Sequence, residues 1–244
     1  MHRQHVFIVG DALTGAATRY EFLTTMLRRR YDVTVIDLAE LNTDEVAFDS
    51  LVGAVAPSVN SGQASDELPA LIGFGAGATI ALQVGAEHPD MLSSLMLVGG
   101  WLVAPAKMRA IVRLLERLTP LDRELAAESV YAQMTSSIGW PTQTHTIPEP
   151  ALSVMRAACE VDLSKTAPAI STPTLVVGCA RDEFASLEQS QQLFGAIANA
   201  RFSTITSGHN VVAERPAELL SLIDQFIAQP NLYPAGTAIT EARP

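Results

Sequence analysis

Two residues in the last third of the chain have side chains that suit general acid–base chemistry. Asp182 follows the apolar run TLVVGCA in the local sequence ARDEF, and His209 lies in SGHNVVAERP, directly before a predicted helix. A carboxylate can orient an imidazole and stabilise its protonated form, and an imidazole titrates near neutral pH. On local sequence alone, Asp182 could equally be a loop aspartate that caps the next helix, and His209 a loop histidine without a role.

A glycine-rich turn at residues 73–77 lies at the centre of the chain's organisation. The apolar run 68–74 leads into it and the small-residue run 76–87 leaves it, which predicts a strand, a sharp turn and a helix. In this context the pattern G-x-S-x-G is a nucleophile elbow, which lifts a serine hydroxyl above the end of a parallel sheet. Here the serine position is Gly75, so no acyl-enzyme can form there. Ala76 still offers a backbone N–H group as one oxyanion donor.

The stretch GFGAGATIALQVGAEHPDMLSSLMLVGG resembles the elbow, following helix and next strand of the α/β-hydrolase superfamily. The resemblance extends to the apolar run HVFIVG near the N-terminus, the strand that ends at Asp182 and the turn at His209, and so spans residues 5–228. It implies an α/β fold with a mostly parallel central sheet flanked by helices.

The resemblance also implies site residues. The superfamily's chain order of nucleophile, acid and histidine fits positions 75, 182 and 209, with Glu183 as the alternative acid. Asp182 would then orient His209, which would act as a general acid or base. Cys179 lies three residues before Asp182 and is a possible substitute nucleophile, although a buried cysteine at a strand end is the commoner case.

Asp11 is a second departure from the superfamily pattern, which has His-Gly after the first strand and then a residue that supplies an oxyanion N–H. This chain has Val-Gly-Asp-Ala at residues 9–12, so Asp11 replaces either the glycine, with Ala12 as donor, or the donor itself. A carboxylate about 4 Å from an oxyanion costs roughly 4 kcal/mol at a dielectric near 20, whereas losing one donor costs about 3 kcal/mol. Asp11 therefore argues against ordinary ester hydrolysis and permits acid–base work opposite His209. The alternative is a loop aspartate turned to solvent or bound to backbone amides.

Apolar periodicity divides the chain into an α/β core and an inserted segment. Buried strands are predicted at 5–10, 33–38, 68–74, 95–98, 174–177 and 201–205, and core helices at 17–30, 44–55, 76–87, 187–197 and 211–227. Residues 1–100 and 169–228 would form the core, and 57–67 a loop. Residues 101–168, with helices at 108–118, 121–134 and 151–161, would form a helical cap, and residues 229–244 a flexible tail.

Apolar residues that could line a substrate pocket are Phe74, Trp101, Met108, Trp140 and Met155, although cap-to-core packing explains any single one of them as well.

Composition limits the remaining classes of function. The formal net charge is −10, and the one basic cluster, residues 28–30, ends a predicted helix, so we expect no nucleic-acid partner. We also expect no membrane partner, because no apolar run reaches the roughly 20 residues of a membrane span. Two cysteines and the lack of a secretory pattern at the N-terminus predict a cytoplasmic protein. No residue cluster has metal-ligand spacing, and no cofactor is expected. The sequence leaves the oligomeric state open.

Three hypotheses for function remain. The first is an enzyme without a covalent intermediate, in which His209, Asp182 and Asp11 catalyse elimination, cyclisation, condensation or direct water attack on a small apolar carbonyl or ester-type substrate. Such members of the superfamily include tailoring enzymes of natural-product pathways. The second is a non-catalytic pseudohydrolase that binds a ligand or a protein. The third is a serine hydrolase inactivated by an engineered change at Gly75.

Overall fold

A computed structural model of the chain describes residues 3–14, 19–40, 46–61, 67–136, 147 and 150–239. Within these ranges, seven strands form one sheet in the order β2-β1-β3-β4-β5-β6-β7, and every pair of neighbours is parallel. The strands are β1 (His5–Val9), β2 (Asp32–Ile36), β3 (Ala70–Phe74), β4 (Ser94–Val98), β5 (Thr174–Cys179), β6 (Ala200–Ile205) and β7 (Ala238–Ile239). This is the α/β-hydrolase fold predicted from the sequence.

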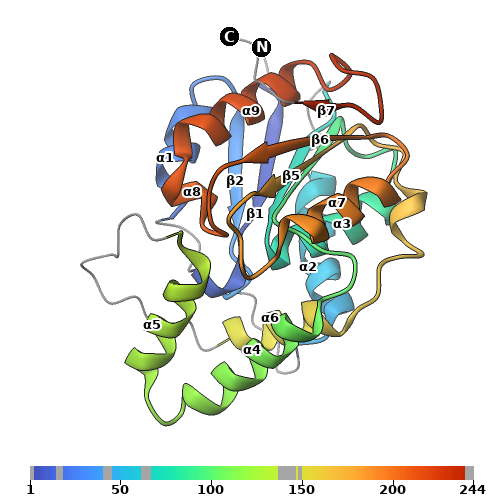
Figure 1. The fold of residues 1–244 in the computed structure, drawn as a ribbon. Coiled ribbons are helices and arrows are strands. Elements are labelled where there is room, and N and C mark those ends of the chain that lie inside the picture. Colours follow the sequence, from blue (N-terminus) through green and yellow to red (C-terminus); the bar gives the residue numbers. More distant parts are fainter. Residues whose placement is uncertain are drawn as a thin grey trace.

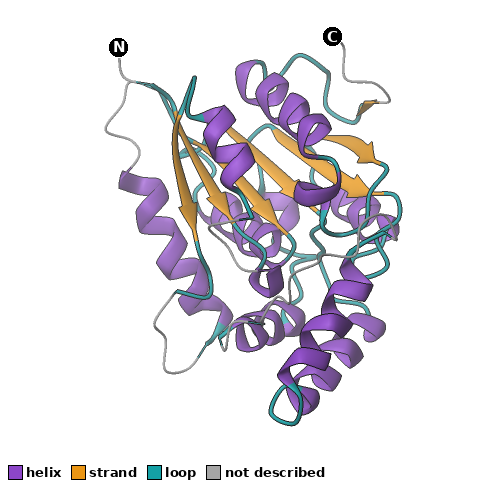
Figure 2. Cartoon of the chain, turned by 90° about the vertical axis from the view of Figure 1, so that its left-hand side faces the viewer, coloured by secondary structure: helices purple, strands orange, loops and turns teal. Residues whose placement is uncertain are grey.

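Helices cover both faces of the sheet (Figures 1 and 2). One face packs on α1 (Glu21–Leu27), α8 (Val211–Glu214) and α9 (Pro216–Ala228), and the other on α2 (Phe48–Ser61), α3 (Ala76–Glu87) and α7 (Leu187–Ala196). Successive strand residues point to opposite faces: in β1, Val6 and Ile8 join one apolar cluster and Phe7 and Val9 join the other. Both faces are therefore buried, which explains why the strands are continuously apolar.

Three further helices occupy the segment predicted as a cap: α4 (Ala106–Leu118), α5 (Arg123–Met134) and α6 (Ala151–Glu160). In Figure 1, α4 and α5 extend away from the sheet at the bottom of the view. Asp122 begins α5 as its N-cap, since its Oδ1 atom accepts a hydrogen bond of 2.9 Å from the N–H of Leu125. Short 3₁₀ turns lie at Ala12–Thr14, after β1, and at Ala167–Ala169, before β5.

Two predicted helix boundaries are wrong, and proline is involved in both. Helix α2 runs through Pro57 to residue 61, where a loop was predicted, because Val55 and Val59 on the same helix face are fully buried in the core. That burial outweighs the backbone hydrogen bond lost at proline. The predicted helix 211–227 is two helices, because Pro216 disfavours the helical conformation of Arg215, whose φ is −137°.

The structure also differs from the flexible tail predicted from residue 229 onward. Strand β7 pairs with β6, and the guanidinium of Arg201 donates a hydrogen bond of 2.7 Å to the carbonyl of Tyr233. The N–H of Gly236 donates to the carbonyl of Ala200 at 2.8 Å. These long-range contacts leave no periodic signal in a segment rich in proline and glycine, and residues 240–244 lie outside the described residues.

Candidate active site

The sharp turn between β3 and α3, predicted as the elbow, has a glycine in an unusual backbone conformation. Gly75 has φ 54° and ψ −119°, in the left-handed region that L side chains rarely adopt. The elbow also lies directly against the end of β1, since a Cβ atom added at Gly77 would lie 2.4 Å from the carbonyl oxygen of Val9. This close approach brings the residues after β1 next to position 75.

The carboxylate of Asp11 occupies the space above the elbow. Its Oδ1 atom lies 2.5 Å from the position that a Cβ atom at Gly75 would take, and it accepts a long hydrogen bond of 3.4 Å from the N–H of Ala76. Asp11 is 6% exposed, so it does not face solvent, but its contact with the N–H of Ala76 is of the kind in the other half of the alternative, an aspartate bound to backbone amides. The oxyanion donor predicted at Ala76 therefore faces a carboxylate of the chain itself.

Tyr20 contacts the backbone of Asp11, a role that the sequence did not reveal. The buried hydroxyl of Tyr20 accepts a 3.0 Å hydrogen bond from the N–H of Asp11, and the Tyr20 ring packs against Phe74 with 5.1 Å between ring centroids. Burial raises the pKa of Tyr20, so its hydroxyl stays protonated. The signal in the sequence was weak: one tyrosine at the start of a predicted amphipathic helix.

Asp182 and His209 meet as the resemblance implied. The Nδ1 and Oδ2 atoms of the pair lie 2.6 Å apart, and both side chains are almost completely buried. The Oδ1 atom of Asp182 accepts 2.8 Å hydrogen bonds from the N–H groups of Phe184 and Ala185, which fixes the carboxylate. The structure thus pairs His209 with Asp182, whereas the alternative acid, Glu183, is exposed.

The other ring nitrogen of His209 points at the elbow. Its Nε2 atom lies 2.9 Å from the same Cβ position at Gly75 that Asp11 approaches, so the carboxylate and the imidazole flank the place of a missing side chain. Burial alone would lower the pKa of His209, but the carboxylates of Asp182 and Asp11 raise it to about 9. The imidazole is then protonated at neutral pH and can donate a proton.

Arg19 adds a cation to this group. It precedes α1, is half-buried, and lies with its guanidinium carbon 5.9 Å from the ring centroid of Tyr131 on cap helix α5. Burial lowers the pKa of Arg19, while Tyr20, Tyr131 and Asp11 oppose that effect. Arg19 also lowers the pKa of His209, so it is electrostatically part of the same site.

Glu214 is a further residue that the sequence analysis did not single out. Its carboxylate accepts hydrogen bonds from the N–H groups of Ser136, at 2.8 Å, and Gly208, at 3.1 Å, and from the Ser136 hydroxyl. Glu214 thereby ties the end of α5 to the turn that carries His209. In the sequence, Glu214 is only one residue of the stretch SGHNVVAERP that contains the histidine.

The described residues that were predicted to line a pocket are buried. Trp101 is fully buried, and its indole N–H donates to the carbonyl of Ala158 at 3.0 Å; Met108 and Met155 are also fully buried in the core. Phe74 is buried beside Tyr20, Ala12 is buried in the 3₁₀ turn after Asp11, and Trp140 lies outside the described residues. Their contact with substrate stays a prediction.

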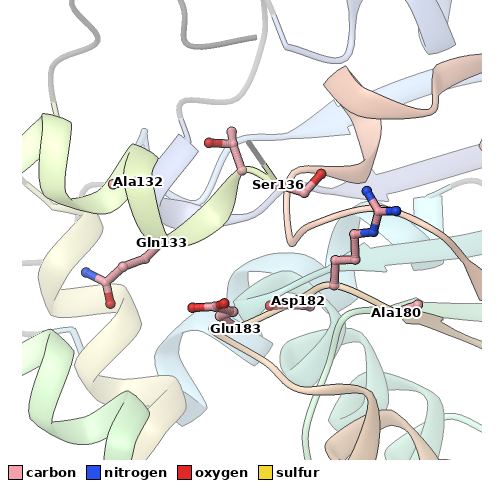
Figure 3. Close-up of a pocket in the computed structure, with 8 residues that line it drawn as sticks. Ala132, Gln133, Ser136, Ala180, Asp182 and Glu183 are labelled. Carbon is pink, nitrogen blue, oxygen red and sulfur yellow. The ribbon is translucent and has the colours of Figure 1, made fainter. Parts of the chain in front are cut away.

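A cavity of about 620 Å³ lies between the end of α5 and the loop after β5, and its lining is a mixture of polar and apolar surface. Figure 3 shows Gln133 and Ser136 on the helix side and Asp182 and Glu183 on the loop side. The remaining lining residues are Ala132, Thr135, Ala180 and Arg181. This cavity differs from the apolar pocket expected beneath the cap, although its volume suits a small molecule.

Cys179 is poorly suited to replace the nucleophile. It is fully buried at the end of β5, and burial raises the pKa of its thiol to about 12. The nucleophilic thiolate is therefore scarce at neutral pH.

In the ranges that the structure describes, no group of three His, Cys, Asp or Glu side chains could hold a metal ion. Nor does any helix in those ranges combine the length and apolar character of a membrane span.

Comparison with known proteins finds relatives whose names are those of a deacetylase and a carbamate hydrolase. The chain is 24% identical over 171 residues to pyrrolizixenacetamide deacetylase of Xenorhabdus hominickii, covering 64% of each protein. It is 30% identical over 148 residues to a Klebsiella pneumoniae (strain 342) protein whose provisional name is carbamate hydrolase RutD, covering 54% of this chain and 55% of that protein. The chain thus spans less than two thirds of either relative.

Among solved structures, the enol-lactonase of Burkholderia xenovorans LB400 has the same fold, with a TM-score of 0.80 and 17% identity over 93% of this chain and 92% of that one. No protein-family model matches the sequence.

Proposed function

We propose that the chain is an enzyme with an α/β-hydrolase fold that catalyses proton transfer on a carbonyl substrate and forms no covalent intermediate. The observation that carries the proposal is the position of the Asp11 carboxylate: its Oδ1 atom and the Nε2 atom of His209 lie 2.5 Å and 2.9 Å from the place that a β-carbon at residue 75 would take. Two groups that flank one point, one a carboxylate and one a protonated imidazole, can remove and supply protons on the same substrate.

The proposed step is an elimination in which atoms and charges balance. Asp11 takes a proton from the carbon next to the carbonyl, and the electron pair of that C–H bond forms an enolate. The enolate expels the leaving group, which takes a proton from the imidazolium of His209. Asp182 stabilises the imidazolium and keeps its Nε2–H directed at the elbow. Transfer of the proton from Asp11 to His209 then restores the starting state. Cyclisation or condensation would use the same enolate.

Hydrolysis by direct attack of water is the second candidate, since the names of both curated relatives refer to hydrolysis. It would require Asp11 or His209 to activate a water molecule beside the substrate carbonyl. The carboxylate of Asp11 disfavours this route because it faces Ala76 N–H, where the tetrahedral oxyanion would bind.

A pseudohydrolase would keep the same geometry and bind its ligand without conversion. An engineered serine-to-glycine change fits less well, because a β-carbon at position 75 would meet Asp11.

Exchange of carbon-bound protons tests the proposal without knowledge of the natural substrate. The protein would be incubated in D₂O with a panel of small ketones, esters and 1,3-dicarbonyl compounds, and loss of the α-proton signals followed by ¹H NMR. We expect exchange above the buffer rate, and a decrease of about 10²–10⁴-fold in Asp11→Asn and His209→Asn. Asp90→Asn, at an exposed aspartate, is the matched control. Exchange that persists in both site variants would refute the proposal, and ester hydrolysis without exchange would favour water attack.

A further inference from the structure

Arg201 is a buried cation at the end of the sheet away from the candidate active site. It is the second residue of β6 and pairs with Leu175 near the start of β5, whereas Asp182 and His209 follow the other ends of these two strands. Arg201 is only 4% exposed, and a guanidinium keeps its positive charge at neutral pH. Because an unpaired buried charge is costly, buried charged side chains normally have a partner of opposite charge.

The hydrogen-bond partners of Arg201 are all neutral. Its Nε–H donates to the carbonyl of Tyr233 at 2.7 Å, and its Nη1 atom donates to the carbonyl and the side-chain oxygen of Asn199 at 2.8 and 2.7 Å. Its Nη2 atom donates to the side-chain oxygen of Asn231 at 3.3 Å. These bonds use four of the five guanidinium N–H groups. None of the ion pairs in the described part of the chain involves Arg201, so its charge has no carboxylate beside it.

A small cavity borders Arg201. Its volume of about 10 Å³ is close to the minimum that one water molecule, or one ion of similar size, needs. The hydroxyl oxygen of Tyr233, which also lines the cavity, is buried and has no hydrogen-bond partner among the described residues. Gln225 and Gln229, on and just after α9, are the other polar residues in the described lining, and the rest of that lining is apolar. The cavity therefore combines a cation and a hydroxyl donor, and no acidic residue of the described lining competes for them.

A monatomic anion suits this cavity better than a water molecule does. Both could accept hydrogen bonds from the guanidinium and from Tyr233, but only an anion also neutralises Arg201. The end of α9 is close by, since α9 ends at Ala228 and Gln229 lines the cavity, but a helix C-terminus carries only about half a negative charge. The volume excludes polyatomic anions such as sulfate or a carboxylate.

We propose that Arg201 and Tyr233 bind a halide ion, chloride under ordinary conditions, which fastens the segment after α9 to the edge of the sheet. Arg201 belongs to β6, whereas Asn231 and Tyr233 belong to the segment that ends in β7. The N–H of Gly236 in the same segment donates to the carbonyl of Ala200 at 2.8 Å. Chloride at Arg201 therefore stabilises residues 229–239 in their folded position without contact with the acid–base residues.

Line broadening of the ³⁵Cl NMR signal measures chloride binding to the whole chain. Wild-type protein should broaden the signal of sodium chloride in a saturable manner, and sodium bromide should reverse the broadening by competition. Arg201→Gln, which removes the charge but keeps an amide donor, should reduce the specific broadening at least about tenfold, and Tyr233→Phe about two- to fivefold. Arg29→Gln, at an exposed arginine after α1, should leave it unchanged. The formal net charge of −10 disfavours chloride elsewhere on the surface.

Amide hydrogen exchange tests whether the ion fastens the segment. Exchange at residues 230–239 would be compared in sodium chloride and in sodium gluconate at equal ionic strength, since gluconate is too large for the cavity. For a dissociation constant of about 10 mM, exchange should be about 20-fold slower in about 200 mM chloride. The difference should shrink in Tyr233→Phe and persist in Tyr31→Phe.

Three results would overturn the proposal. Wild-type protein without saturable broadening would show that the cavity takes water and no halide. Broadening that persists in both Arg201→Gln and Tyr233→Phe would place the chloride elsewhere. Saturable broadening with equal exchange in the two salts would remove the role in fastening the segment. If circular dichroism shows that Arg201→Gln is unfolded, Tyr233→Phe and the comparison of salts in the wild type decide the matter.

Discussion

The carboxylate of Asp11 and the missing side chain of Gly75 share one space: Asp11 Oδ1 lies 2.5 Å from the position of a Cβ atom at residue 75. Real β-carbons do not approach an oxygen that closely, so either position can hold a side chain only if the other gives way. Glycine at 75 and aspartate at 11 are therefore two parts of one arrangement, and their substitutions should not act independently.

Gly75→Ser alone should not restore a serine hydrolase. We expect it to lower the free energy of unfolding by about 1–3 kcal/mol, since a β-carbon at positive φ is strained and also displaces Asp11. The double variant Gly75→Ser with Asp11→Gly removes that conflict. It should hydrolyse p-nitrophenyl acetate and take up one serine-directed phosphonate label, detected by intact mass. Both should be lost on adding His209→Ala.

Gly195→Ser in α7 is the control for this series, because a β-carbon there meets nothing within 4 Å and should leave stability nearly unchanged. Esterase activity in the single Gly75→Ser variant equal to that of the double variant would contradict the coupling. It would also revive the hypothesis that serine was replaced at position 75 by engineering.

The pH dependence of stability should reveal the charged state of His209. Folding raises its pKa from 6.5 to about 9, so the stabilisation is complete below pH 6.5 and is lost as the pH rises through 9. The loss should amount to no more than about 4 kcal/mol, by the rule of about 1.4 kcal/mol per unit. Urea unfolding from pH 6 to 9.5 would measure it in the wild type. The loss should be absent in His209→Asn and retained in His88→Asn, and identical pH profiles for the wild type and His209→Asn would rule out a protonated imidazole.

Much of the fold was predictable because the strands are buried on both faces. Runs such as HVFIVG and TLVVGCA leave little choice but parallel strands within a sheet, and the chain order of Gly75, Asp182 and His209 then brings these residues to one edge. The pairing of Asp182 with His209 was implied by the resemblance to the superfamily, and local sequence alone could not separate Asp182 from a capping aspartate.

What could not be predicted depends on single long-range contacts. The backbone of Asp11 contacts the Tyr20 hydroxyl, and Gly77 lies against the end of β1, and neither contact leaves a periodic pattern. The tail is ordered by Arg201, a buried cation on a strand that looked ordinary. The prediction of pocket-lining residues was the least certain one. Trp101 and Met108 are apolar enough to line a pocket or to fill a core, and the sequence does not distinguish these two positions.

Glu214 takes no part in the proposed proton transfer, but it should stabilise the two segments that it joins beside the site. Glu214→Ala leaves the N–H groups of Gly208 and Ser136 without their acceptor, which should lower the free energy of unfolding by about 1–3 kcal/mol. It should also raise hydrogen exchange at the end of α5 and at the histidine turn. Glu218→Ala, at an exposed glutamate on α9, is the control. Equal stability of the two variants in urea would show that Glu214 does not hold the two segments together.

Tyr20→Phe tests whether the backbone of Asp11 must be held for the carboxylate to act. The substitution keeps the ring against Phe74 but removes the hydroxyl that accepts the N–H of Asp11, and a buried donor without a partner should cost about 1–3 kcal/mol. Because a displacement of about 1 Å can reduce a rate about 10²-fold, deuterium exchange should fall by about 10- to 100-fold while binding of ligands changes less. Tyr31→Phe, which leaves Asp11 untouched, is the matched control. If Tyr20→Phe exchanges protons as fast as Tyr31→Phe, Asp11 is positioned by the elbow alone, and Tyr20 serves only to pack α1 against the sheet.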